Sequence, residues 1–427
     1  MSKSKEKSFL WILFIAITAV QCVFALYWLL LNFNEYYPDF FSDNYIKAAQ
    51  TLKVDDFMGI GYALIVKILG HEEILKIFQM LSVYASGAWL THSFLNKKIY
   101  SKECLITGAF ILSNPFVIQS TCMVLPNTLI LAGLMLMAGL YKEKRVLWFL
   151  FTDILVGLLN PDYIYIAILG FLPFIIFGLF KKKESSVKFL VSAFTAFLFC
   201  FLITNLVTDS KAYGGYEKNL LTLLVQRTAI GNLASYNDMY VMYHDMDFYT
   251  ELTAAEKTTE ELWYTVFPKT AEILGESECI EICKYVFERS LEKGIGRILK
   301  LTFKDFLYYF TVPFSIAFIY LTKGMDSSIV NLLMGFIQKN PGLFKVYLLF
   351  EIFIIAVLII TGIIKALKEK RLKTNVITLM AFVWITCVIS LFGSFVFVRG
   401  FNYLNALPVI TGWPLILIYI NYAREER

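Results

Sequence analysis

The chain has 427 residues, of which 58% are hydrophobic and 17% are charged, and its formal net charge is +5. Soluble domains are typically about 45–50% apolar and about 25% charged, so this composition excludes an ordinary soluble globular protein. The apolar residues gather in runs of roughly 20, the length that a helix needs to cross about 30 Å of hydrocarbon. The sequence therefore predicts an all-α, multi-pass integral membrane protein.

About ten apolar runs are candidates for membrane-spanning helices. They cover residues 9–31, 74–96, 103–123, 126–141, 146–160, 162–180, 187–207, 345–364, 375–397 and 403–421. The first run is too long for a signal-peptide core and has no small-residue cleavage site behind it, so we expect a retained transmembrane helix.

Clusters of lysine and arginine lie between these runs, and their positions predict the orientation of the chain. They are Lys3, Lys5 and Lys7; Lys97, Lys98 and Lys102; Lys142, Lys144 and Arg145; 181–183 with Lys188; 365–373; and Arg424 with Arg427. With ten such spans and a cytoplasmic N-terminus, every cluster falls on the cytoplasmic side, as the positive-inside rule requires. We therefore expect a cell-membrane protein with both termini in the cytoplasm.

The long segment 208–344 is predicted to be a mostly helical extracytoplasmic region. Within it, Arg297, Lys300 and Lys304 share one face of a predicted helix at 296–310, opposite a stripe of Leu and Phe side chains. This pattern is typical of a helix that lies in the lipid headgroup layer. The chain thus divides into an N-terminal transmembrane module of seven spans, 1–207, with its first outer loop at 32–73; the region 208–344; and C-terminal transmembrane helices, 345–427.

An aspartate in the first outer loop is the first candidate for chemistry. Asp43 lies in the stretch FSDNYIKAAQTL, two positions from both Phe41 and Tyr45. Ser42 or Asp43 is a candidate N-cap of a short helix that runs to Leu52. A carboxylate at the mouth of a helix bundle is also placed to act as a general base on an incoming hydroxyl. A capping residue is fixed in space, so both interpretations stand together.

The sequence around three other carboxylates is weaker evidence for a functional role. Asp55 and Asp56 favour a solvated turn, with oxygen ligation of a divalent cation as the alternative. Asp153 lies inside a predicted span, where a carboxylate is costly and often functional, and it is expected to face a neighbouring helix or to snorkel. No zinc-ligand spacing is present in the sequence, so we assign neither a metal site nor another cofactor.

A late arginine is the candidate for binding phosphate. Arg399 follows the ninth predicted span, close to Asn402 and Tyr403. A guanidinium at the level of the headgroups is suited to bidentate binding of a phosphate, and it is equally suited to anchoring a helix at the interface.

Several short motifs together resemble the GT-C class of membrane glycosyltransferases, which includes protein O-mannosyltransferases and lipid A aminoarabinose transferases. They are Ser42-Asp43-Asn44-Tyr45 with Gly61-Tyr62; Ser113-Asn114-Pro115-Phe116 with Leu125-Pro126-Asn127; the junction from Gly157 to Asp162; and Arg399 with Tyr403 and Pro408. The sequence departs from the class at two positions. Asn127 stands where the class often has an acidic residue, and Asn160 stands where it often has a basic one.

The resemblance implies transfer of a sugar from a polyprenyl-phosphate donor to an acceptor hydroxyl on the extracytoplasmic face, with inversion. The acceptor would be a glycan, a lipid or a protein. Asp43 would be the general base, and Arg399, Tyr45, Tyr403 and Asp162 would contact substrate. The amphipathic pattern at 296–310, and not the resemblance, predicts that Arg297, Lys300 and Lys304 face the lipid interface.

Two other classes of function also fit a multi-pass chain with a large outer region. An O-antigen-type polymerase or ligase would depend on outer-loop residues such as Arg227 and His244. A lipid or sugar transporter would usually show inverted repeats, and the sequence has no matching halves. No phosphate-binding P-loop is present in the sequence, which argues against ATP-driven work, and no pattern indicates a nucleic-acid partner.

Overall fold

The computed structural model describes residues 40–55, 58–70, 72–180, 184–209, 295–311, 373–393 and 404–412, together with isolated positions within 15–29, 272–277 and 335–353 and at 415. Every named element in these ranges is an α-helix. The helices are α2 (Phe40–Thr51), α3 (Ile60–Leu69), α4 (Glu72–Leu95), α5 (Lys102–Leu112), α6 (Pro115–Thr121), α7 (Asn127–Lys142), α8 (Val146–Leu159), α9 (Asp162–Phe180), α10 (Glu184–Val207), α17 (Gly296–Thr311) and α21 (Lys373–Leu391).

Two of these helices, α9 and α10, are long and apolar enough to cross a membrane. A third candidate is the pair α5 and α6, which together have the required length but meet at an angle of 67°. The all-α class is therefore confirmed in the described residues, and these helices indicate a membrane protein. The helices α3, α7 and α8 are apolar but shorter than a full span.

The bend between α5 and α6 has a local cause in the sequence. Pro115 occupies the first turn of α6, and the residue before a proline is pushed out of the helical conformation. Asn114 is that residue, and its side-chain oxygen accepts a hydrogen bond of 3.0 Å from the Phe116 backbone N–H. The run predicted as one span at 103–123 is therefore two helices.

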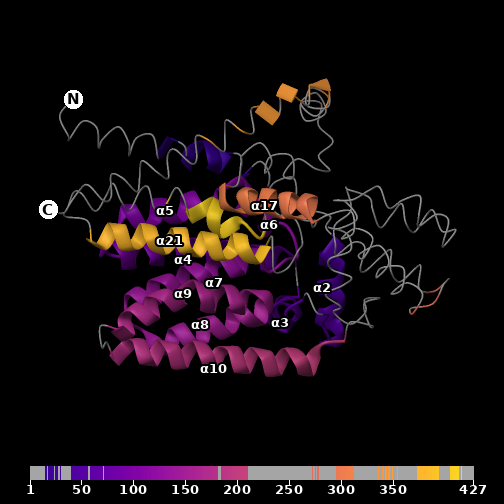
Figure 1. Ribbon diagram of the computed structural model, residues 1–427, viewed down its shortest axis with the longest axis horizontal. Coiled ribbons are helices and arrows are strands. Elements are labelled where there is room, and N and C mark those ends of the chain that lie inside the picture. The colour runs from indigo at the N-terminus through magenta and orange to yellow at the C-terminus, as the bar shows by residue number, and fades with distance from the viewer. Residues whose placement is uncertain are drawn as a thin grey trace.

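Helices that are close in the sequence mostly pack side by side (Figure 1). Helix α4 packs on α5 and α7, α7 packs on α8, and α10 packs on both α8 and α9. Helix α21 packs on α9, and α17 packs on α21. The core is continuous from α2 to the segment 404–412, so the C-terminal segment belongs to the same bundle as the N-terminal module.

Loops of the bundle gather at two ends. At the end that we call the basic end, residues 92–97 meet residues 141–145: the Ser93 hydroxyl donates to Glu143 over 2.6 Å, and Arg145 pairs with Glu143 at 2.8 Å. At the other end, which we call the pocket end, five parts of the chain meet: residues 52–55 with 58–59, 122–127, 158–163, 207–209 and 404–406. There the Val54 N–H donates to the Val207 carbonyl over 3.2 Å, and the Asp209 N–H donates to the Val54 carbonyl over 2.7 Å.

The start of α3 lies directly against the end of α8. A Cβ atom on Gly59 would overlap the carbonyl oxygens of Leu158 and Leu159, so only glycine permits this approach. The contact holds Gly59 and the start of α3 against the α8–α9 junction.

We predict that Gly59→Ala destabilises the protein by about 1–3 kcal/mol, because the added methyl group forces two backbones apart. Thermal unfolding of the purified protein in detergent measures this effect. The matched control is Gly296→Ala, since a Cβ at Gly296 meets nothing within 4 Å. Equal unfolding temperatures for the two variants would contradict the close contact at Gly59.

Candidate functional site

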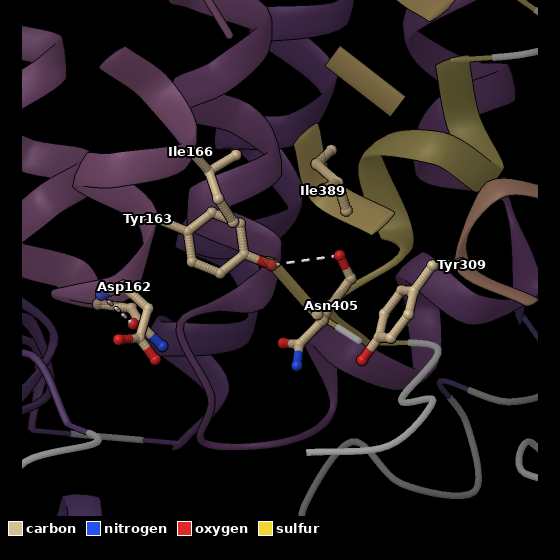
Figure 2. Close-up of a pocket in the computed structure, with 8 residues that line it drawn as sticks. Asp162, Tyr163, Ile166, Tyr309, Ile389 and Asn405 are labelled. Atoms are coloured by element: carbon tan, nitrogen blue, oxygen red, sulfur yellow. Dashed lines mark hydrogen bonds between the residues drawn. The ribbon is translucent and has the colours of Figure 1, made fainter. Parts of the chain in front are cut away.

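A pocket lies at the pocket end, where α8, α9, α17, α21 and the segment 404–406 meet (Figure 2). The pocket offers about 20 Å³ to the centre of a water-sized group, and the empty space at the site, open solvent included, is about 310 Å³. The lining combines carboxamides, a carboxylate and two phenols with apolar side chains: Asn160, Asp162, Tyr163, Ile166, Tyr309, Ile389, Gly393 and Asn405.

The α8–α9 junction supplies the acidic side of the pocket. Asn160 ends α8 in an extended conformation, which the following Pro161 favours. The Asn160 side-chain oxygen accepts a hydrogen bond of 2.9 Å from the Asp162 backbone N–H. This bond starts α9 and places the Asp162 carboxylate at the pocket, where its side chain is buried.

Asn405 joins the C-terminal segment to the N-terminal bundle. Its side-chain oxygen accepts a hydrogen bond of 3.1 Å from the Asn127 amide at the start of α7. Its backbone carbonyl accepts a bond of 3.2 Å from the Tyr163 hydroxyl (Figure 2). Three segments that are far apart in the sequence, around residues 127, 160–163 and 405, therefore meet at one place.

Tyr309 forms the wall of the pocket on the α17 side. Its side chain is fully buried, although α17 is amphipathic and exposes other residues. A Cβ on Gly393 would lie 2.7 Å from the Tyr309 ring, so the absence of a side chain there lets the ring pack against the end of α21.

Asp43 lies on α2, and its side chain is exposed. The prediction that Ser42 or Asp43 caps this helix is wrong, because both residues lie within its first turn. Ser42 has a different role: its hydroxyl accepts a hydrogen bond of 3.2 Å from the Val124 N–H. This bond ties α2 to the loop 122–126, which leads directly to Asn127. A carboxylate in a first turn is favoured by the helix dipole.

Two other residues of the predicted first outer loop, 32–73, are buried. Tyr45 packs edge-on against Tyr62, with ring centroids 4.9 Å apart, and its contact with substrate stays a prediction. The prediction of a solvated turn is wrong for Asp55, whose side chain is fully buried where the backbone pairs with residues 207–209. Asp56 lies outside the described residues.

Asp153 faces the interior of the bundle and does not snorkel. Its side chain is 1% exposed, and neither carboxylate oxygen has a hydrogen-bond partner among the residues that the structure describes. It lies near the thiol of Cys200 on α10, which donates to the Ile154 carbonyl.

Several predicted residues lie outside the described part of the structure: Arg399, Tyr403, Arg227, His244 and the side chain of Arg297. On α17, which matches the predicted helix at 296–310 to within one residue, Lys300 and Lys304 are exposed together with Leu299 and Phe303. Among the described residues, no group of three His, Cys, Asp or Glu side chains is placed to hold a metal ion.

Sequence reasoning did not find Tyr309 or Asn405. Tyr309 lies on a third face of α17 together with the buried Thr302 and Asp305. The sequence pattern was divided only into a charged and an apolar stripe, and this division does not reveal a third, buried face. Asn405 lies between Tyr403 and Pro408, two residues of the GT-C resemblance, but a lone asparagine between two apolar residues carries no signal of a binding role.

Comparison with known proteins identifies no relative: no family model, no curated protein and no solved structure matches this chain significantly.

We predict that Asn127→Leu destabilises the protein by about 1–3 kcal/mol, because the Asn405 side-chain oxygen loses its donor in a half-buried site. Asn127→Asp is the matched control. Rotation of the Asn405 amide by a half turn presents its NH₂ group to the new carboxylate, so this variant keeps the hydrogen bond. Thermal unfolding of both purified variants gives the measurement, and equal losses would argue against the Asn127–Asn405 bond.

Proposed function

We propose that the chain is a glycosyltransferase that moves a sugar from a polyprenyl-phosphate donor to an acceptor hydroxyl. One observation carries this proposal. Parts of three segments behind the GT-C resemblance lie close together: Asn160 and Asp162 line one pocket with Asn405, and Asn127 is hydrogen-bonded to Asn405. The pocket contains the buried carboxylate of Asp162. The helix that carries Asp43, α2, is hydrogen-bonded through Ser42 to the loop 122–126, which leads to Asn127.

The proposed topology has ten spans, with the pocket end outside and the basic end in the cytoplasm. The clusters Lys97–Lys98 and Lys142–Arg145 lie at the basic end, which supports this orientation through the positive-inside rule. Nucleotide sugars are cytoplasmic, so a transferase that works at the outer face needs a donor carried by a lipid. An outward-facing pocket end therefore suits a polyprenyl-phosphate donor.

In the proposed reaction, the Asp43 carboxylate takes the proton of the acceptor hydroxyl as that oxygen attacks the anomeric carbon. The bond from the anomeric carbon to the phosphate oxygen breaks, and the lipid phosphate leaves with the electron pair. The attack comes from the face opposite the leaving group, so the configuration inverts. Arg399 is proposed to stabilise the negative charge that develops on the phosphate. The exposure of Asp43 is consistent with the access that an incoming acceptor needs.

The remaining predicted residues have supporting roles in this proposal. Asp162 contacts the substrate in the pocket, and Tyr45 and Tyr403 are proposed to flank it. The exposed Lys300 and Lys304, with Arg297, hold α17 at an anionic lipid surface, as a basic stripe beside exposed Leu299 and Phe303 favours.

We predict that Asp43→Asn lowers the rate of sugar transfer by about 10²–10⁴-fold, because the variant keeps the size of the side chain and loses its basicity. Transfer of radiolabelled sugar from a membrane lipid extract to endogenous acceptors, by the purified folded protein, measures this rate. The matched control is Asp209→Asn, another carboxylate at the pocket end, which pairs with the exposed Lys53 at 2.7 Å.

The control variant is expected to keep the wild-type rate within about threefold, because an exposed ion pair contributes little to stability. Full activity of Asp43→Asn would reject Asp43 as the base. Loss of activity on changing Arg227 or His244, with Asp43 dispensable, would favour a polymerase or ligase. Movement of lipid or sugar across the membrane without any transfer would favour a transporter.

A further inference from the structure

We propose that Pro173 in α9 and Trp384 in α21 act as a pair that holds α21 at a fixed place on α9 and thereby positions the α21 side of the pocket. The proline removes the helical donor of one backbone carbonyl inside the membrane, and the tryptophan supplies a donor from the neighbouring helix. This inference does not depend on the proposed function, because it concerns how the pocket is held and not what it binds.

The proline interrupts the hydrogen bonds of α9 near the middle of the helix. Pro173 lies inside α9, and a proline has no backbone N–H to donate. In an α-helix each carbonyl accepts from the N–H four residues later, so the carbonyl that loses its helical donor is that of Leu169. The ring of a proline also crowds that same carbonyl. The Leu169 carbonyl therefore needs a donor from outside α9.

That donor comes from α21. The Trp384 indole N–H donates to the Leu169 carbonyl over 2.9 Å, and the two residues are 215 positions apart in the sequence. Gly170, the next residue of α9, also lies close to α21, because a Cβ atom there would be 3.5 Å from the Ile385 side chain. The two helices are thus in contact at the point where the proline removes a hydrogen bond from α9.

A membrane makes this bond more important than it would be in water. Helix α9 is long and apolar enough to span a membrane, and Leu169 lies near its middle. Hydrocarbon offers no water to a backbone carbonyl, and membrane helices tolerate proline where a neighbouring helix satisfies the freed group. Tryptophans usually gather at the membrane surface. Trp384 instead lies near the middle of α21, where the Leu169 carbonyl accepts from its N–H.

Burial of the indole ring does not explain the contact. The Trp384 side chain is 43% exposed, so much of its surface is not packed against the protein. A phenylalanine at this position would keep most of the packing on α9, but it has no N–H to donate. The directed hydrogen bond is therefore the part of the contact that only a donor can supply.

The bond lies close to the pocket along both helices. Ile166 comes three residues before Leu169, and Ile389 comes five residues after Trp384. Both isoleucines line the pocket, together with Gly393 at the end of α21. Because a helical turn has 3.6 residues, the bond is about one turn away from these side chains. A shift of α21 along α9 would move Ile389 relative to Ile166, so the bond fixes this side of the pocket.

A double-mutant cycle on the full-length protein in detergent tests the pair. Trp384→Phe removes the donor, and Pro173→Ala restores the N–H that the Leu169 carbonyl lacks within α9. Thermal unfolding is measured for the parent, the two single variants and the double variant. The packing lost from Trp to Phe is the same in both backgrounds, so it cancels in the cycle. The matched control is Trp148→Phe, the same replacement on α8 at a side chain that is 61% exposed.

Trp384→Phe is expected to lower the unfolding temperature at least about twice as much in the parent as in the Pro173→Ala background, because the carbonyl keeps a donor only in the latter. Trp148→Phe should change it little in either background. If Trp384→Phe does not fold, a folded double variant gives the same support. Equal losses in the two backgrounds would overturn the proposal, as would an equal loss from Trp148→Phe or a double variant that does not fold.

Hydrogen exchange followed by mass spectrometry separates positioning from general stability. Trp384→Phe should speed exchange in α21 and in the segment 404–412 by about fivefold or more, and leave α4 and α7 within about twofold of the parent. Adding Pro173→Ala should restore slow exchange. Faster exchange spread evenly over the bundle, or unchanged exchange in α21, would overturn the positioning role. No step needs a sugar or a transfer reaction, so the outcome is independent of the proposed function.

Discussion

The hydrogen bonds that converge on Asn405 hold the pocket together. The Asn127 amide and the Tyr163 hydroxyl both donate to this one residue, and they come from α7 and α9 of the N-terminal module. Buried polar groups are costly when they are unpaired, so these bonds specify how the segment 404–412 meets the bundle. Helix α21 packs on α9 beside this meeting point, and α17, which carries Tyr309, packs on α21. The residues that depart from the GT-C pattern, Asn127 and Asn160, are both part of this arrangement.

The two ends of the bundle differ in chemistry. From this difference we infer which end binds the substrate. The basic end is held by charged side chains around Glu143, including Arg145, whose guanidinium lies 5.2 Å from the Trp89 ring centroid. The pocket end is held mainly by backbone and amide hydrogen bonds, and it contains buried carboxylates at Asp55 and Asp162. Charged groups that pair with each other are suited to fastening helices. A carboxylate beside carboxamides is suited to binding a polar ligand.

Much of the fold is predictable from the sequence because span length and helical periodicity are local. The helices from α4 to α10 lie within a few residues of the predicted apolar runs, and α17 matches its amphipathic prediction. The burial of Asp55 depends on backbone pairing with residues 207–209, about 150 positions away, and no local pattern reveals it. The pocket is likewise not predictable from local patterns in the sequence. Asp162 was found through its motif, whereas Asn405 and Tyr309 acquire their roles only when α9, α17 and α21 come together.

The most direct test of the proposed function is to determine which side of the membrane each end of the bundle faces. Gln50→Cys places a thiol on the exposed side of α2 at the pocket end, and Lys144→Cys places one at the basic end. Labelling of intact cells with a membrane-impermeant maleimide, with the parent chain as background, reports the two positions separately. We predict that Gln50→Cys is labelled in intact cells and that Lys144→Cys is labelled only after the membrane is opened. The reverse pattern would place the pocket in the cytoplasm and contradict transfer from a lipid-linked donor at the outer face.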